Sequence, residues 1–192
     1  MNDRRTALLV AAIDEIARSG TRGLRVELVA KRANVSPALI YHHFGDRSGL
    51  LQAALEHIGE RADAYTANGT GTAHERLQRV LIDEIQDNKV VRTNSAAWGE
   101  LRDAAIFDKA LRPTIASLTQ RWNDDIAELI TLGHTDGSIH RSIDPIAASQ
   151  RLSACVEGVS SRWLTGMLTT TAARAHVSAI AEALLQPTSP TI

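Results

Sequence analysis

The chain of 192 residues is long enough for one well-buried core, or for a small domain joined to a larger one, and its 44% hydrophobic and 22% charged residues are ordinary for a globular protein. No stretch approaches the roughly 20 uninterrupted apolar residues of a membrane span, so we expect no membrane partner and a cytoplasmic location. The single cysteine excludes an internal disulfide framework, and the net charge of −1 divides into +3 over residues 1–55 and −4 over the remainder.

Helical periodicity runs through almost the whole chain, and no segment shows the sustained alternation of a strand. In the first third the pattern predicts helices at about 3–19, 26–32 and 37–43. A fourth predicted helix begins after GDRSG and runs to about residue 65. Gly20 supplies a stop for the first of them. Beyond NGTGT, helices are predicted at about 74–88, 95–106, 109–132, 145–168 and 173–185. The expected fold class is therefore all-α.

The segment RVELVAKRANVSPALIYHHF, residues 25–44, places two short helices on either side of Asn34-Val35. Ser36 can accept a hydrogen bond from the free N–H groups of the second helix, and Pro37 fits its first turn. Ile40 and Phe44, four residues apart, would face the core. The spacing predicts a helix-turn-helix, whose second helix enters the DNA major groove. The residues expected on bases are Ser36, Pro37, Ala38 and Leu39, and those expected against phosphates are Tyr41 and His42.

The same stretch resembles a known family. GLRVELVAKRANVSPALIYHHFGDRSGLL, residues 23–51, is similar to the head of the TetR family of bacterial transcriptional regulators. WGELRDAAIFDKALRPTIASLTQRWNDDIAELITLGHTDGSI and CVEGVSSRWL are similar to the C-terminal domain of its choline-responsive BetI subgroup. The resemblance implies a DNA-binding head over residues 1–47, joined by a long helix to a bundle over residues 48–192 that binds ligand and dimerises.

Four positions depart from the family pattern. Asn34 stands where the family has Gly, and Asn also tolerates the left-handed conformation. Arg25 replaces a capping Thr, Arg47 replaces a Lys, and Leu39 replaces a small polar residue, so Leu39 would make apolar contacts, for example to a thymine methyl. The resemblance adds three basic residues to the expected DNA contacts, namely Arg25, Lys31 and Arg47.

The body of such a regulator is partly hollow and binds an inducer. The candidates for the cavity are its large and polar side chains, Trp98, Glu100, Arg102, Arg121, Trp122, Asp125 and His134. The last two predicted helices carry an apolar stripe suited to a two-fold dimer. The expected interface residues are Leu152, Val156, Val159, Trp163, Ile180 and Leu184. The resulting hypothesis is a homodimeric repressor that binds a palindromic operator and is released by a small molecule.

Two other function classes are weaker. An all-α small-molecule binding protein could use the head for protein contacts, but that role would not need Arg25, Tyr41 and Arg47 together. Enzyme activity has little support, because the sequence contains no nucleophile elbow, phosphate-binding glycine loop or His-Glu-x-x-His motif. Adjacent His42 and His43 diverge by about 100° on a helix, so we expect no metal site, and no cofactor is expected.

Overall fold

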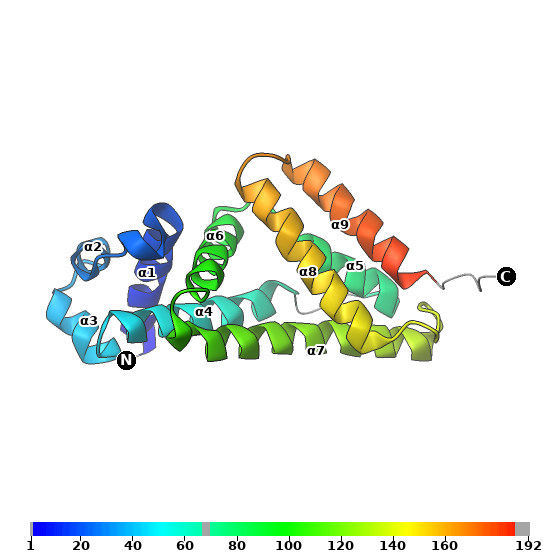
Figure 1. The fold of residues 1–192 in the computed structure, drawn as a ribbon, viewed down its shortest axis with the longest axis horizontal. Coiled ribbons are helices and arrows are strands. Elements are labelled where there is room, and N and C mark those ends of the chain that lie inside the picture. Colours follow the sequence, from blue (N-terminus) through cyan, green and yellow to red (C-terminus); the bar gives the residue numbers. More distant parts are fainter. Residues whose placement is uncertain (1, 67–69, 187–192) are drawn as a thin grey trace. The chain divides into compact units, whose positions relative to one another are not determined.

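The computed structural model describes residues 2–66 and 70–186, and within these ranges it contains helices and no strand (Figure 1). The elements are α1 (Asn2–Gly23), α2 (Val26–Arg32), α3 (Pro37–Phe44), α4 (Arg47–Thr66), α5 (Ala73–Asp83), α6 (Lys89–Ala104), η1 (Lys109–Leu111), α7 (Arg112–Asp136), α8 (Pro145–Leu164) and α9 (Thr170–Leu185). The predicted all-α class is confirmed. In the part of the chain that is described, no helix is long and apolar enough to cross a membrane.

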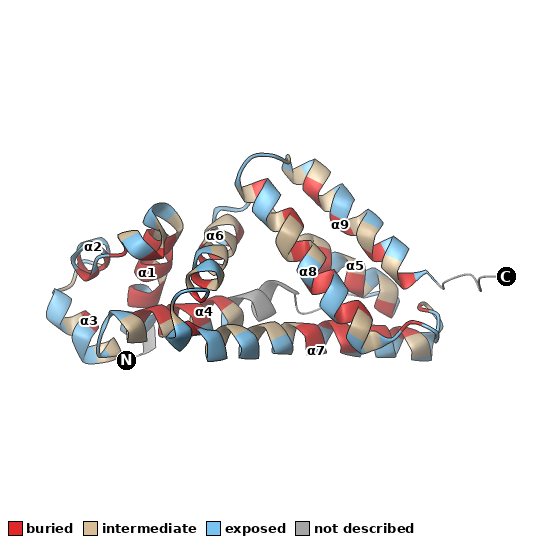
Figure 2. Cartoon of the chain, in the orientation of Figure 1, coloured by how far each residue is buried: buried red, intermediate tan, exposed pale blue. Residues whose placement is uncertain are grey.

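Packing divides the chain into two compact units. The first combines Met1–Asp63 with Asn88–Leu118, and the second combines Ala64–Asp87 with Thr119–Ile192. Each unit has its own buried core, which Figure 2 shows in red. The first unit thus contains α6 as well as the head helices. The functional boundary expected at residue 47 stays a prediction, because these units are defined by packing alone.

In the first unit, α1 packs against both α2 and α6. Leu8, Ile16 and Ile40 are fully buried there, together with Leu55 of α4 and Leu101 of α6. Burying a side chain of this size contributes about 1.5–3 kcal/mol to folding. The three short head helices therefore draw part of their stability from α4 and α6.

Main-chain hydrogen bonds close the turn between α2 and α3. Asn34 adopts a φ of 54°, so the predicted left-handed residue is confirmed. The N–H of Val35 donates to the carbonyl of Ala30 at 2.9 Å, and the N–H of Asn34 donates to that of Lys31 at 3.3 Å. This pair of bonds is the Schellman pattern, which satisfies the last carbonyls of a helix and reverses the chain.

The starts of α3 and α4 each differ from expectation. Ser36 sits at the N-cap position before Pro37, but its side chain makes no capping hydrogen bond, so that prediction is wrong. Helix α4 begins at Arg47, earlier than predicted, because the Asp46 carboxylate accepts the N–H of Gly49 at 2.8 Å and caps it. A Cβ at Gly49 would lie 2.1 Å from the carbonyl oxygen of Phe44, so this close approach requires glycine.

In the second unit, α8 and α9 lie side by side (Figure 1). Trp163 is 1% exposed, and its Nε1–H donates to Thr170 Oγ1 at 2.9 Å. Four residues that were predicted at a dimer interface are buried inside this chain: Leu152, Val156, Val159 and Trp163. That part of the prediction is wrong, because the stripe packs on the core of its own chain. Ile180 and Leu184 are half-buried against the same core.

Candidate nucleic-acid interface

Helix α3 presents its N-terminal half to solvent. Ser36, Pro37 and Ala38 are exposed and Leu39 is half-buried. Ile40 is only 1% exposed, as predicted for its core-facing position. The helix period of 3.6 residues separates these two faces, so one short helix both anchors itself in the core and offers a row of side chains outward.

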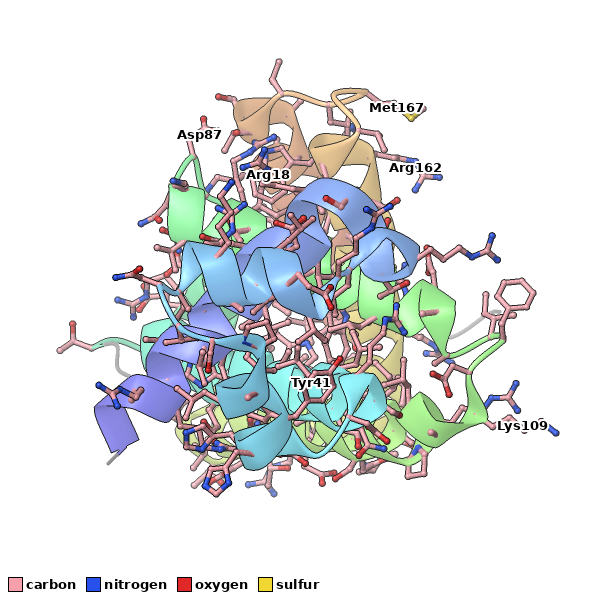
Figure 3. All side chains as sticks on the ribbon, turned by 90° about the vertical axis from the view of Figure 1, so that its left-hand side faces the viewer. Arg18, Tyr41, Asp87, Lys109, Arg162 and Met167 are labelled. Atoms are coloured by element: carbon pink, nitrogen blue, oxygen red, sulfur yellow. The ribbon has the colours of Figure 1, made fainter. Side chains whose placement is uncertain are left out.

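Tyr41 and His42 continue the outward surface of α3. Tyr41 is 47% exposed. It is labelled in Figure 3, which views the molecule from the side on which α3 lies in Figure 1. His42 is exposed and His43 half-buried. The His43 ring lies 6.0 Å from the half-buried Phe44 ring, centroid to centroid. A partly packed phenol with an accessible O–H suits a donor to a phosphate, which positions a protein on DNA without reading sequence.

Basic residues lie at both ends of α2 and at the start of α4. Arg25 and Lys31 are exposed, and Arg25 occupies the N-cap position of α2 without a side-chain capping bond. The Arg47 guanidinium donates from Nε to the carbonyl of Leu24 at 3.4 Å and from Nη2 to the carbonyl of Thr21. Because a guanidinium has five N–H donors, these bonds leave others for an anion.

A buried carboxylate also ties two head helices together, a contact that sequence reasoning missed. Glu15 of α1 is 5% exposed and accepts from Arg32 Nη2 of α2 at 3.0 Å and from the Ser19 hydroxyl at 2.9 Å. Burial alone would raise the pKa of Glu15. The hydrogen bonds from Arg32 and Ser19, with the charges of Arg32 and Arg18, outweigh burial and hold this pKa below its ordinary value.

The arrangement is thus an exposed helix start flanked by basic side chains on a small helical bundle. Comparison with known proteins supports that description. The family model for the bacterial regulatory proteins of the tetR family matches residues 8–54, and that for the C-terminal part of BetI-type transcriptional repressors matches residues 73–186. The chain belongs to the TetR family.

Individual proteins similar to this TetR-family chain are also transcriptional regulators. A solved structure from Rhodococcus sp., assigned to the same family, is 44% identical, covers 97% of this chain and all of its own, and superposes with a TM-score of 0.91. The regulator BetI from Burkholderia thailandensis is 25% identical over 86% of this chain and 82% of its own length. A Saccharomonospora viridis regulator, solved in complex with choline, is 25% identical, with 95% and 97% coverage and a TM-score of 0.80.

The TetR-family assignment makes the chain a transcriptional regulator and not an enzyme, since its relatives are regulators of this kind. The helix-turn-helix predicted from residues 25–44 is therefore a DNA-binding element. Which of its side chains contact DNA stays a prediction.

The residues predicted for the ligand cavity fall into both units of this TetR-family regulator. Trp98, Glu100 and Arg102 belong to the first unit, whereas Arg121, Trp122, Asp125 and His134 belong to the second. Glu100 is exposed, and its Oε2 accepts the N–H of Thr21 at 3.2 Å. The Glu100 carboxylate is thus engaged with the main chain of α1, and its contact with a ligand stays a prediction. Arg102 pairs with the neighbouring Asp103 at 3.1 Å, and Arg121 and Asp125 are exposed.

Within the second unit, Trp122 and His134 lie at the core, and their contact with a ligand stays a prediction. The Trp122 ring packs, partly buried, against the core. The Nε2 of His134 and the Oδ1 of Asn123, both on α7, are buried and have no hydrogen-bond partner. Buried polar atoms are normally paired, so each unpaired one is a place where a bound molecule would gain a hydrogen bond. Sequence reasoning missed Asn123, whose position on the apolar face of α7 was the available signal.

Proposed function

We propose that this TetR-family regulator is a homodimeric repressor that binds a palindromic operator through α3 and is released by a small molecule. The observation that carries the proposal is the exposed N-terminal half of α3, flanked by Arg25, Lys31, Tyr41 and Arg47. Base contacts from Ser36 to Leu39 supply specificity, and the flanking residues supply affinity through phosphates. Binding therefore weakens steeply as salt rises.

The dimer forms through the outward faces of α8 and α9. Small side chains line these faces: Ala154 on α8 and Ala175, Ala179 and Ala183 on α9 are all exposed. Small residues let helices approach closely, and a two-fold axis turns two such faces into one four-helix interface. Two heads related by that axis read two halves of a palindrome, with half-sites one or more turns of DNA apart.

The ligand binds to the interior of the second unit, where Asn123 and His134 offer unpaired polar atoms. Burial, followed by the negative charge of Asp83, raises the pKa of the Glu84 carboxyl in this unit to about 7. The choline bound by the Saccharomonospora viridis relative is a cation, which supports a neutral or cationic class for this chain.

Release requires only that the ligand prefers the arrangement that cannot bind DNA. Each 1.4 kcal/mol of preference weakens operator binding about tenfold. Helix α4 leaves the head directly after Arg47, so a change in α4 would alter the separation of the two heads.

Enrichment of fragmented genomic DNA on the purified protein, at about physiological salt, tests this function. We expect enrichment of a palindromic site, and its loss with Ala38→Asp, which places a negative charge on the base-facing surface. The matched control is Ala116→Asp, which adds the same charge at another exposed helical alanine and should leave enrichment unchanged. Equal enrichment by all three proteins would show that α3 does not read DNA.

A further inference from the structure

The main chain at Thr21, in the last turn of α1, is held by side chains from two other helices. Thr21 is 8% exposed. Its N–H donates to Glu100 Oε2 of α6 at 3.2 Å, and its carbonyl accepts from Arg47 Nη2 at the start of α4. Arg47 Nε also donates to the carbonyl of Leu24 at 3.4 Å. One peptide segment is therefore fixed from both sides by charge-assisted hydrogen bonds, the stronger class of hydrogen bond.

The local backbone explains why Thr21 needs such a partner. Gly20 leaves the helical conformation, with φ 69° and ψ 170°. A buried N–H after such a break must find a new acceptor. A Cβ built on Gly20 would lie 2.8 Å from Glu100 Oε2, so glycine also makes room for the carboxylate. The break at Gly20 thus frees the Thr21 N–H and leaves room for the Glu100 carboxylate that accepts it.

The contact joins the end of α1, just before the helix-turn-helix, to α6. Helix α6 belongs to the same compact unit as the head and packs along α1. A second contact supports the first, because the Arg22 guanidinium lies 5.9 Å from the centroid of the Phe107 ring, just beyond the end of α6. Helix α2 begins five residues after Thr21, at Val26. Through these two contacts α6 is linked to the segment that leads into α2.

We propose that Glu100 is a positioning residue for DNA binding: through the Thr21 N–H it holds the helix-turn-helix in the orientation that lets both heads of a dimer reach their half-sites together. This inference rests on the proposed function. Binding of the second head is intramolecular, and its effective concentration depends on the direction in which that head points. A head that has lost this restraint still binds a half-site but engages a full operator less well.

The test compares a full palindromic site with a single half-site. We expect Glu100→Ala to weaken binding to the full site about tenfold, because a less well oriented second head has a lower effective concentration at its half-site, and to leave half-site binding within about twofold. Glu100→Gln keeps a side-chain oxygen and should restore full-site binding. Gly20→Ala, on the other side of the contact, should reproduce the loss. The matched control is Asp103→Ala, an exposed carboxylate of α6 whose recorded partner is Arg102.

Two outcomes would overturn the proposal: an equal loss on both DNAs, which would mean that Glu100 only supports the fold of the head, or no loss on either. A measurement without DNA separates this inference from the proposed function. Spin labels at Glu27→Cys and Lys89→Cys, both exposed positions, in a Cys155→Ala background report the distance between α2 and α6. We expect Glu100→Ala to broaden that distance distribution. An unchanged distribution would refute the positioning role even if no operator is found.

Discussion

Replacing Glu15 with glutamine removes a buried charge while keeping the shape of the side chain. In the native protein both carboxylate oxygens of Glu15 accept a hydrogen bond, one from Arg32 at 3.0 Å and one from Ser19 at 2.9 Å. A hydrogen bond to a charged group contributes about 1.5–3 kcal/mol. Glutamine keeps one acceptor, its amide oxygen, and the partly exposed Arg32 guanidinium can form hydrogen bonds with water instead. We therefore expect Glu15→Gln to lower the free energy of unfolding by about 2 kcal/mol at neutral pH.

The loss should depend on pH in a defined direction. The folded pKa of Glu15 is held below the ordinary glutamate value of 4.5 by its bonds to Arg32 and Ser19, against burial. A carboxyl with a depressed folded pKa stabilises the protein fully above its unfolded pKa and loses that contribution as pH falls through the folded pKa. The stability curves of the native protein and of Glu15→Gln should therefore run parallel above about pH 5 and converge in acid.

Urea unfolding followed by far-ultraviolet circular dichroism, between pH 3 and pH 8, measures both curves. Glu27→Gln is the matched control, since Glu27 lies on α2 but is exposed; we expect it to change stability by less than about 0.5 kcal/mol. A difference between native protein and Glu15→Gln that stays constant into acid would refute the assigned cause. No difference at neutral pH would refute the buried ion pair itself.

Three further substitutions test other parts of the structure. Tyr41→Phe should weaken binding to operator and random DNA alike by about 1 kcal/mol, measured by fluorescence anisotropy; a loss confined to operator would make Tyr41 a base reader. Leu39→Ala should lower the preference for operator over random DNA without changing the salt dependence, and a changed salt slope would contradict its base-facing role. Gly133→Ala should destabilise the second unit by about 1–3 kcal/mol in urea unfolding, because its Cβ would lie 2.6 Å from Ile139 side-chain atoms. An unchanged midpoint would show that Ile139 moves aside freely.

Local features of the head could be predicted from the sequence because they depend on neighbouring residues. The bounds of α2, the left-handed Asn34 and the buried Ile40 follow from helix period and turn chemistry. The capping role predicted for Ser36 is wrong, because Ser36 occupies the N-cap position but its side chain makes no capping hydrogen bond.

Features that join distant segments could not be predicted. Glu15 and Arg32 are 17 residues apart, and Thr21 and Glu100 are 79 apart. Periodicity shows that a helix has an apolar face, but it does not show which surface covers that face. For this reason the stripe that includes Trp163 was assigned to a dimer interface, although it lies in the core of its own chain.

Protection of guanine N7 from dimethyl sulfate tests the central claim most directly, because N7 lies in the major groove, whereas adenine N3 lies in the minor groove. On the enriched DNA site, we predict protection of guanine N7 in two half-sites related by a two-fold axis, with adenine N3 left reactive between them. Ala38→Asp should abolish that protection. Protection of the DNA backbone without any protected N7, or protection confined to the minor groove, would contradict the claim that α3 reads the operator.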